Sequence, residues 1–273
     1  MCYESCMLKA YSALTKTGII VFSLLAALTG YAVSYDVHIS PEQFDWLSPV
    51  MLMVGLYLVA AGSFAINQAQ EWRIDAKMQR TEKRPIPQGL IQPWQAYALG
   101  FIFCAVGLVF MNALGTYPAM LSLATVVLYN GVYTLWWKRK MAFGAVPGAI
   151  PGAMPVVIGY SVNTTNIFDP ACVYLFLVLF LWQMPHFWAI AIRFKDDYKS
   201  GGIPVLPVSI GVSRTLYHMG LYTLAYVGVA MMAPWFLKAN LFYLLLVVPI
   251  SVKVLWEFSK FFKANAAQGW LPF

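Results

Sequence analysis

Three residues with possible metal-binding side chains, Asn67, Glu71 and Asp75, follow one another at intervals of four. If this segment continues a helix, the three side chains lie along one helical face. Two carboxylates and an amide oxygen suit a hard cation such as Mg2+. This ion keeps several waters and completes its shell with phosphate oxygens of a substrate. The row therefore predicts a metal site for a phosphorylated substrate.

Cationic side chains follow this row directly, before the Pro85-Ile86-Pro87 run that ends any helix. Arg80, Lys83 and Arg84 could bind the same phosphates, and arginine can do so through two parallel hydrogen bonds. The alternative is a solvated basic loop, which explains Lys77 and Lys83 equally well. It is a weaker explanation for the Asn67 row, because polar groups at the end of a long apolar run are costly unless they are used.

A second charged segment, RFKDDYKSGGIPVLPVSIG, begins at Arg193. It contains the adjacent acids Asp196 and Asp197, which cannot share one face of a helix. We expect one of them to bind metal and the other to support it. Arg193 and Lys195 supply cations, so the segment combines acids and bases as the first one does.

The elements that must position these residues are membrane helices. The 273-residue chain is 60% hydrophobic with a mean hydropathy of +0.67, and its apolar runs approach the roughly 20 residues that span a bilayer core. The alternation typical of a β-barrel is absent from the sequence. We predict a single all-α transmembrane domain over 1–273, a polytopic helical bundle with charged loops capping a central cavity. Its eight spans are 17–36, 46–66, 93–111, 115–137, 143–162, 170–192, 213–235 and 240–259.

Loop charges predict how the bundle is oriented. Of the 18 Lys and Arg residues, all except Lys238 and Lys253 fall on one side of the predicted spans. The opposite side holds Lys238 together with the acids Asp36, Glu42, Asp45 and Asp169. The positive-inside rule therefore places both charged segments on the cytoplasmic face of a bacterial inner membrane, or on the matrix face in mitochondria. The net charge of +7 follows from this topology and gives no reason to expect a nucleic-acid partner.

Paired acidic and basic segments at the mouth of a helical bundle point to an allylic diphosphate substrate. Mg2+ and basic side chains would stabilise the leaving diphosphate. Aromatic faces would stabilise the allylic cation by about 2 kcal/mol when desolvated. The aromatic residues in spans that reach the basic face are Tyr129, Tyr133, Trp136, Trp137, Trp182, Phe187 and Trp188, although most of them are equally well explained as packing residues.

These segments resemble the UbiA-type membrane prenyltransferases. The family pattern N-x3-D-x3-D-x-x-M-x-R-T-x-x-R-P is matched by Asn67, Glu71, Asp75, Met78, Arg80, Thr81, Arg84 and Pro85. Tyr133–Arg139 and Gly148–Tyr160 resemble two further family segments. The most specific match is Trp182–Val208, which resembles the members of the family that farnesylate heme.

This resemblance implies transfer of a farnesyl group from farnesyl diphosphate to a vinyl group of heme B, with addition of water, giving heme O. It assigns the metal and diphosphate roles to Asn67, Glu71, Asp75, Arg80, Arg84, Lys138, Arg193, Asp196 and Asp197. Heme is a substrate here, and Mg2+ is the cofactor. His186, within WQMPHFW, could ligate the heme iron or orient the macrocycle, and a helix-packing role is an equally good explanation. Heme A synthase or terminal-oxidase assembly proteins are the implied partners.

The sequence departs from the family pattern at two places. Glu71 stands where the family usually has aspartate, which could alter metal distance or affinity. The resemblance also implies nine helices, and the chain ends at AAQGWLPF, where a ninth would begin, so either this protein is a short version or the sequence is a piece of a longer one.

Two other functions are weaker alternatives. A UbiA-type enzyme acting on an aromatic or quinone-precursor acceptor would use the same metal site, but Trp182–Val208 argues against it. A membrane heme transporter or assembly factor would place polar groups near the membrane midplane. In this sequence the acids of the two charged segments lie at one face.

Overall fold

The computed structural model describes residues 10–35, 45–237 and 239–266, and the regular structure in this part of the chain is helical. Lys238, Asp36 and Glu42, which entered the orientation argument, lie outside these residues. The helices are α2 (Thr17–Ser34), α3 (Leu47–Asp75), α4 (Pro93–Leu114), α5 (Thr116–Val126), the π-helix η2 (Val127–Trp137), α6 (Lys138–Lys140), α7 (Ala145–Tyr160), α8 (Pro170–Arg193), α9 (Lys195–Ser200), α10 (Leu206–Ser209), α11 (Val212–Ala230), α12 (Ala233–Phe236) and α13 (Phe242–Lys263).

The prediction of an all-α polytopic bundle is confirmed, and each of the eight predicted spans contains a helix. Within the described residues, six helical segments are long and apolar enough to cross a membrane: α2, α3, α4, the combined segment Thr116–Lys140, α8 and α13. The count of eight spans is therefore corrected to six by this measure. Helix α7 is too short, at 16 residues, and α11 begins with the polar sequence Ser213-Arg214-Thr215.

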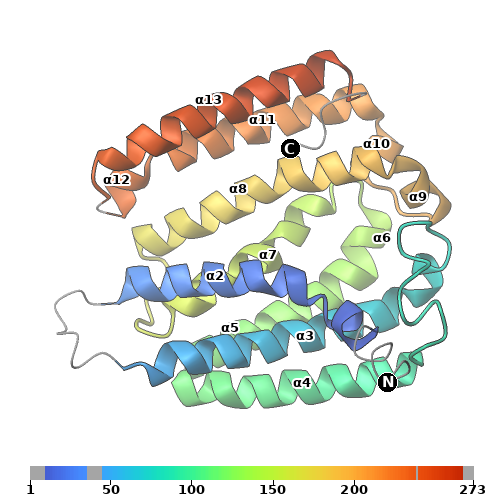
Figure 1. Cartoon of the computed structure of the whole chain (residues 1–273), viewed down its shortest axis with the longest axis horizontal. Coiled ribbons are helices and arrows are strands. Elements are labelled where there is room, and N and C mark those ends of the chain that lie inside the picture. The colour runs from blue at the N-terminus through green and yellow to red at the C-terminus, as the bar shows by residue number, and fades with distance from the viewer. Residues whose placement is uncertain (1–9, 36–44, 238, 267–273) are drawn as a thin grey trace, which may run out of the picture. The chain divides into compact units, whose positions relative to one another are not determined.

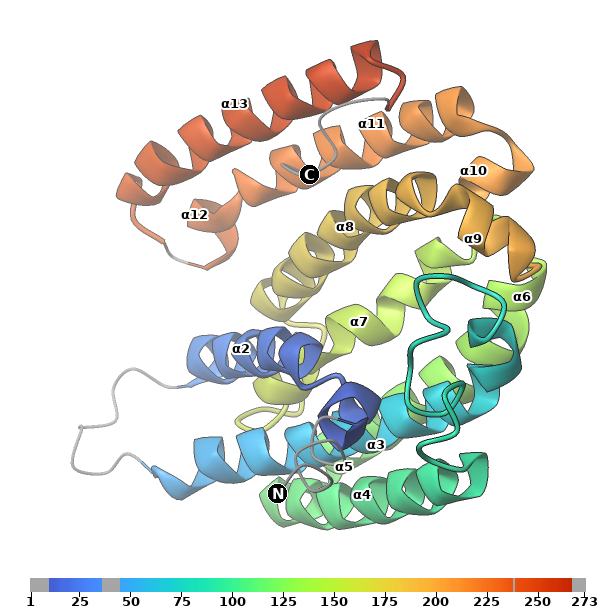
Figure 2. The same cartoon turned by 45° about the vertical axis from the view of Figure 1, so that its right-hand side comes forward.

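The chain forms two compact units. Unit 1 comprises residues 1–136 and 154–167, and unit 2 comprises residues 137–153 and 168–273, so α7 contributes to both. In unit 1, α3 and α4 run side by side in both views (Figures 1 and 2). Their close approach depends on glycine, because a Cβ added at Gly62 would lie 2.5 Å from the carbonyl oxygen of Gly100.

Unit 2 is built around α8, which packs on α11, and α11 in turn contacts α13. Its core contains the fully buried side chains of Met184, Trp188, Met219 and Phe261. Pro185 lies inside α8, which continues past it to Arg193. Gln183, one turn from His186, donates to the carbonyl of Ala149 and so fixes α8 against the first part of α7.

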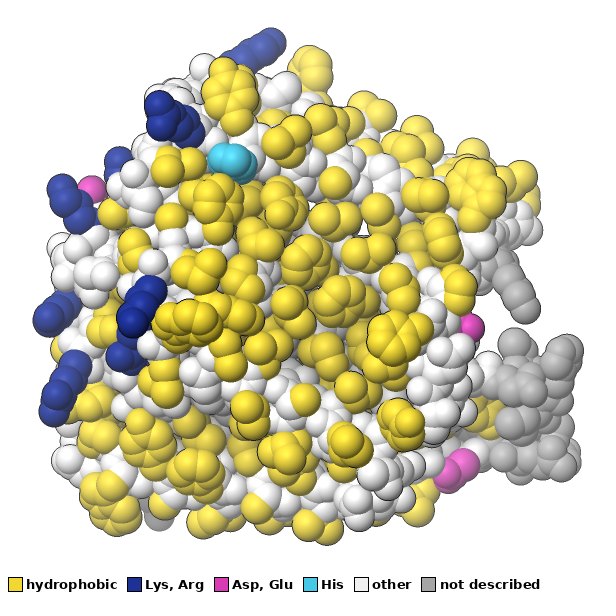
Figure 3. Space-filling view, turned by 180° about the vertical axis from the view of Figure 1, so that it is seen from behind, with side chains coloured by type: hydrophobic (Ala, Val, Ile, Leu, Met, Phe, Trp, Pro, Cys, Tyr) yellow, Lys and Arg dark blue, Asp and Glu magenta, His cyan; other side chains and the backbone are white. Residues whose placement is uncertain are grey.

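Large hydrophobic side chains are exposed over much of the face drawn in Figure 3, where they are yellow. Phe22 on α2 is 73% exposed, and Leu246 on α13 is 71% exposed. Helices whose outward faces are this apolar need an apolar solvent. The exposed surface therefore agrees with the six membrane-length helices.

The stretch Val127–Trp137 is a π-helix, which the sequence did not predict. Long π-helices are rare, and short ones are frequent at functional sites. Here the wider turn directs Asn130 and Thr134 toward α3, and both side chains are buried. This irregular helix therefore lies beside the predicted metal-binding row.

Candidate functional site

The first charged segment begins inside α3, since this helix continues through Asp75. The prediction that Asn67, Glu71 and Asp75 share a continuous helix is confirmed. All three side chains are buried, each at 2% exposure. Two carboxylates enclosed in this way need cations or hydrogen-bond donors to offset the loss of hydration. A buried row of oxygen atoms therefore lies at the end of a membrane helix.

Two hydrogen bonds, one turn apart, join α3 to the π-helix. The side-chain amide of Asn67 donates to Thr134 at 3.0 Å, and that of Asn130 donates to Ser63 at 2.7 Å. Thr134 in turn donates to the carbonyl of Tyr129 at 2.8 Å, which locks its hydroxyl as an acceptor for Asn67. With its nitrogen held this way, Asn67 keeps its side-chain oxygen as the atom that a cation could use.

An ion pair closes the other end of the row. Arg84 contacts Asp75 at 2.6 Å, and the Asp75 carboxylate is almost fully buried while the Arg84 side chain is 21% exposed. The loop between them is held by Thr81, whose hydroxyl donates to the Asp75 carbonyl at 2.9 Å. Arg84, which we expected to bind diphosphate, therefore already neutralises one of the acids predicted to bind metal.

Aromatic rings lie next to the row in unit 1. Tyr129 and Tyr133 stack with centroids 5.8 Å apart, and Phe64 meets Tyr129 edge-on at 5.9 Å. Phe64 precedes Asn67 by one helical turn. The ammonium of Lys16 lies 4.9 Å from the centre of the Phe64 ring. Of the aromatic residues singled out in the sequence, Tyr129 and Tyr133 are thus brought close to the oxygen row.

The remaining predicted cations have more open surroundings. Arg80 is exposed on the loop after α3, and Lys138 is half-buried at the start of α6. Arg193 ends α8 and is exposed, whereas Lys195 is half-buried at the start of α9. These side chains can reach a ligand from solvent, which is what a site for a soluble diphosphate group requires.

The second acidic pair lies in unit 2 on the short helix α9. Asp196 is exposed and Asp197 is half-buried in the first turn of this helix. Gly201 and Gly202 follow, and Gly202 adopts a positive φ of 70° at the turn. Among the described residues, no three His, Cys, Asp or Glu side chains group closely enough to hold a metal. A magnesium ion held by the Asn67 row would therefore need oxygens from water or substrate.

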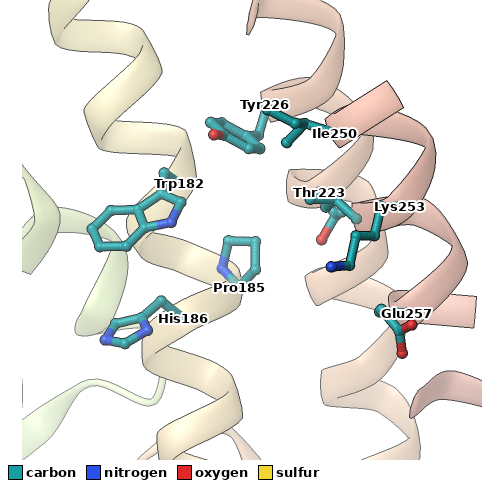
Figure 4. Close-up of a pocket in the computed structure, with 9 residues that line it drawn as sticks. Trp182, Pro185, His186, Thr223, Tyr226, Ile250, Lys253 and Glu257 are labelled. Carbon is teal, nitrogen blue, oxygen red and sulfur yellow. The ribbon is translucent and has the colours of Figure 1, made fainter. Parts of the chain in front are cut away.

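His186 lies on α8, half-buried, with its ring stacked on Trp182 at a centroid distance of 5.2 Å. Both residues line a cavity of about 210 Å3 within unit 2, among α8, α11 and α13 (Figure 4). Trp188, by contrast, is a buried core residue at 1% exposure. His186 therefore borders open space, as a ligand-binding role would need.

Residues 16–273 match the model of the UbiA prenyltransferase family. The chain belongs to this family. A protein named protoheme IX farnesyltransferase from Bdellovibrio bacteriovorus is 51% identical over 267 residues, covering 98% of this chain and 90% of that protein. A protein of the same name from Aquifex aeolicus is 37% identical over 245 residues, covering 89% of this chain and 82% of that relative.

Solved structures of UbiA proteins share the fold. The apo structure of a UbiA homolog from Aeropyrum pernix aligns with a TM-score of 0.77 at 17% identity, covering 94% of this chain and 92% of that one. A UbiA homolog from Archaeoglobus fulgidus, bound to DMAPP and Mg2+, aligns with a TM-score of 0.67 at 18% identity, covering 92% and 86%. At these identities the likeness establishes the UbiA fold.

Sequence reasoning assigned no role to two residues that support the UbiA site. Thr134 orients Asn67, and Thr81 holds the loop that carries Arg84. Both occur in segments that match the family, Thr81 in the first motif and Thr134 in Tyr133–Arg139. The residue type of a buried threonine does not indicate a role in the site, because its hydroxyl acts only through the residue that it positions.

Proposed function

We propose that this UbiA protein is a protoheme IX farnesyltransferase, which makes heme O from heme B and farnesyl diphosphate. The observation that carries the proposal is the 51% identity, over 98% of the chain, to a relative of that name. The sequence Trp182–Val208, which resembles the heme-farnesylating branch, supports the same substrate.

In the proposed reaction, the bond between C1 of the farnesyl group and the diphosphate oxygen breaks, and diphosphate leaves with the bonding electrons. The terminal vinyl carbon of heme then bonds to C1. The resulting cation, on the carbon next to the ring, takes up a water oxygen and releases a proton. The protein has to stabilise the leaving diphosphate and shield the allylic cation from premature attack by water.

We assign the diphosphate charge to Arg80, Arg84, Lys138, Arg193 and Lys195. Mg2+, when bound, would neutralise further diphosphate charge. Its ligands would be the side-chain oxygens of Asn67, Glu71 and Asp75, whose chemistry fits this ion, with water or substrate oxygens completing the shell, and Asp196 or Asp197 stays the predicted ligand from the second charged segment. The buried position of the first three supports this assignment, because their electrostatic field is not screened by water.

The stacked Tyr129 and Tyr133 rings, with Phe64, are the residues we assign to the allylic cation. They lie within one or two turns of Asn67 along α3 or beside its partner Thr134. Each face can contribute up to about 2 kcal/mol when desolvated. In this proposal the basic loops face the cytoplasm, or the matrix in a mitochondrion. Heme A synthase and terminal-oxidase assembly proteins remain the predicted protein partners.

The test supplies membranes containing the protein with heme B, farnesyl diphosphate and Mg2+, and identifies the pigments by mass. Heme O is the expected product. The matched control replaces heme B by a hydroxybenzoate acceptor. Prenylation of the benzoate without formation of heme O would contradict the heme assignment and favour the aromatic-acceptor alternative.

A further inference from the structure

One charged side chain has no place in the proposed diphosphate site. Lys253 lies near the midpoint of α13. It precedes Lys263, the last residue of the helix, by ten residues, and ten residues of α-helix rise by about 15 Å. Helix α13 is long and apolar enough to cross a membrane. A charge at such a position costs about 2.5–3.5 kcal/mol during insertion, so lysines there are rare and commonly functional.

Lys253 lines the cavity of about 210 Å3 described above. In Figure 4 its side chain extends from α13 toward the space in front of Pro185 on α8. No hydrogen bond or ion pair joins the Lys253 ammonium to any described residue. Glu257, one turn further along α13, is instead paired with Lys260 at 3.1 Å. The ammonium is therefore available to a ligand.

The other polar groups of the cavity indicate which chemical groups a ligand would need to carry. The hydroxyl of Tyr226 has no hydrogen-bond partner among the described residues, so it is a second available donor. Thr223 donates to the carbonyl of Met219 and is left as an acceptor. The stacked Trp182 and His186 rings also border the cavity, on α8 and across Pro185 from Lys253 (Figure 4). An ammonium and a phenol beside flat rings suit a carboxylate carried by a planar aromatic molecule.

We propose that this cavity binds a carboxylate of the heme acceptor, with Lys253 as its counter-ion and Tyr226 as a second donor. The inference rests on the proposed function, because heme B supplies both the planar macrocycle and two propionate carboxylates. A cavity of about 210 Å3 accommodates the carboxylate edge of the macrocycle and leaves the remainder outside it. Glu257 also lines the cavity, and its ion pair with Lys260 at 3.1 Å partly offsets its charge.

The experiment measures binding, independently of turnover. Full-length protein in lipid nanodiscs is titrated with heme B and with heme B dimethyl ester, whose propionates carry no charge, and absorbance from empty nanodiscs is subtracted. The wild type is expected to bind the free acid about tenfold more tightly than the ester, since a hydrogen bond to a charged group is lost in the ester.

The Lys253→Met variant is expected to bind both compounds with similar affinity, and its unchanged affinity for the ester would show that the cavity is intact. Lys253→Arg keeps the preference, and Tyr226→Phe lowers it by about threefold, because the phenol supplies one hydrogen bond to the carboxylate whereas the ammonium also supplies the opposite charge. Lys263→Met, the same change on the same helix, should keep the full preference.

An undiminished preference in Lys253→Met would overturn the proposal. So would equal binding of acid and ester by the wild type. These results are separable from a failure of the proposed function. If the wild type makes no heme O but Lys253→Met abolishes the preference, the carboxylate site stands while the reaction does not. If heme O forms and the preference is unaffected, only the carboxylate site fails.

Discussion

The two acidic segments of this protein present their carboxylates in different ways. In unit 1, Glu71 and Asp75 are buried on a 29-residue helix, and Asp75 is paired with Arg84. In unit 2, the six-residue helix α9 carries Asp196 exposed and Asp197 half-buried. The carboxylates of the first set lose their hydration when the protein folds, whereas those of the second set stay in contact with solvent. The first should therefore contribute to both stability and catalysis, and the second to catalysis alone.

The largest effect is expected from Asp75→Asn. Turnover should fall by about 1,000-fold if the carboxylate helps to hold the Mg2+ ion that would neutralise the developing diphosphate charge. The free energy of unfolding should also fall, by about 2 kcal/mol. That is below the usual cost of breaking a buried ion pair, because Arg84 is 21% exposed. Heme O formation and thermal unfolding in detergent measure the two quantities.

The double variant Asp75→Asn with Arg84→Gln separates these two roles. Since it removes both charges, much of the lost stability should return, whereas turnover should stay low. Wild-type turnover in Asp75→Asn would show that the buried row is structural only.

A smaller and purely catalytic effect is expected at α9. Asp197→Asn and Asp196→Asn are expected to lower turnover, the more important of the two by about 100-fold. The melting temperature should stay unchanged, because substitutions at solvent-accessible sites seldom alter stability by more than about 0.5 kcal/mol. Lys199→Gln, on the exposed side of the same helix, is the matched control and should change neither quantity. A loss of stability as large as that of Asp75→Asn would remove the contrast between the segments.

The contrast can be sharpened within unit 1, where two equivalent hydrogen bonds join α3 and η2. Ser63→Ala should lower stability by about 1 kcal/mol, since it removes one buried hydrogen bond, and Thr134→Val by about 2 kcal/mol, since it removes the bonds to Asn67 and to the Tyr129 carbonyl. Only Thr134→Val frees the amide of Asn67 to rotate. Its turnover should fall by about tenfold, equivalent to about 1.4 kcal/mol in the transition state. Equal turnover in the two variants would mean that the orientation of Asn67 does not matter.

The sequence predicted the helical bundle and the continuous helix beneath the first acidic row because both depend on local pattern. Apolar runs indicate membrane helices, and a spacing of four places Asn67, Glu71 and Asp75 on one face. The π-helix was not predictable in this way. Its wider turn depends on side chains that meet α3 from 67 residues away, such as Thr134 and Asn130.

The ion pair between Asp75 and Arg84 also escaped prediction, for a related reason. Both residues were identified, but as ligands of different groups, the metal and the diphosphate. Their direct contact follows from the fold of the loop between them, which Thr81 fixes through the Asp75 carbonyl and which buries Met78 and Ile86. Residue types predict which groups a side chain can bind. They do not predict which of several suitable partners the fold brings closest.

The smallest effect is expected at Glu71, where the family usually has aspartate. Glu71→Asp keeps the charge but withdraws the carboxylate by one methylene, and the tightly buried α3 backbone cannot follow it. Turnover at saturating Mg2+ should be retained. The Mg2+ concentration for half-maximal turnover should rise by less than about tenfold, or about 1.4 kcal/mol. Glu82→Asp, the same change at an exposed position of the same segment, should leave this concentration unaltered. If Glu71→Asp also leaves it unaltered, Glu71 is not a metal ligand, and its burial has to be explained by packing and hydrogen bonding alone.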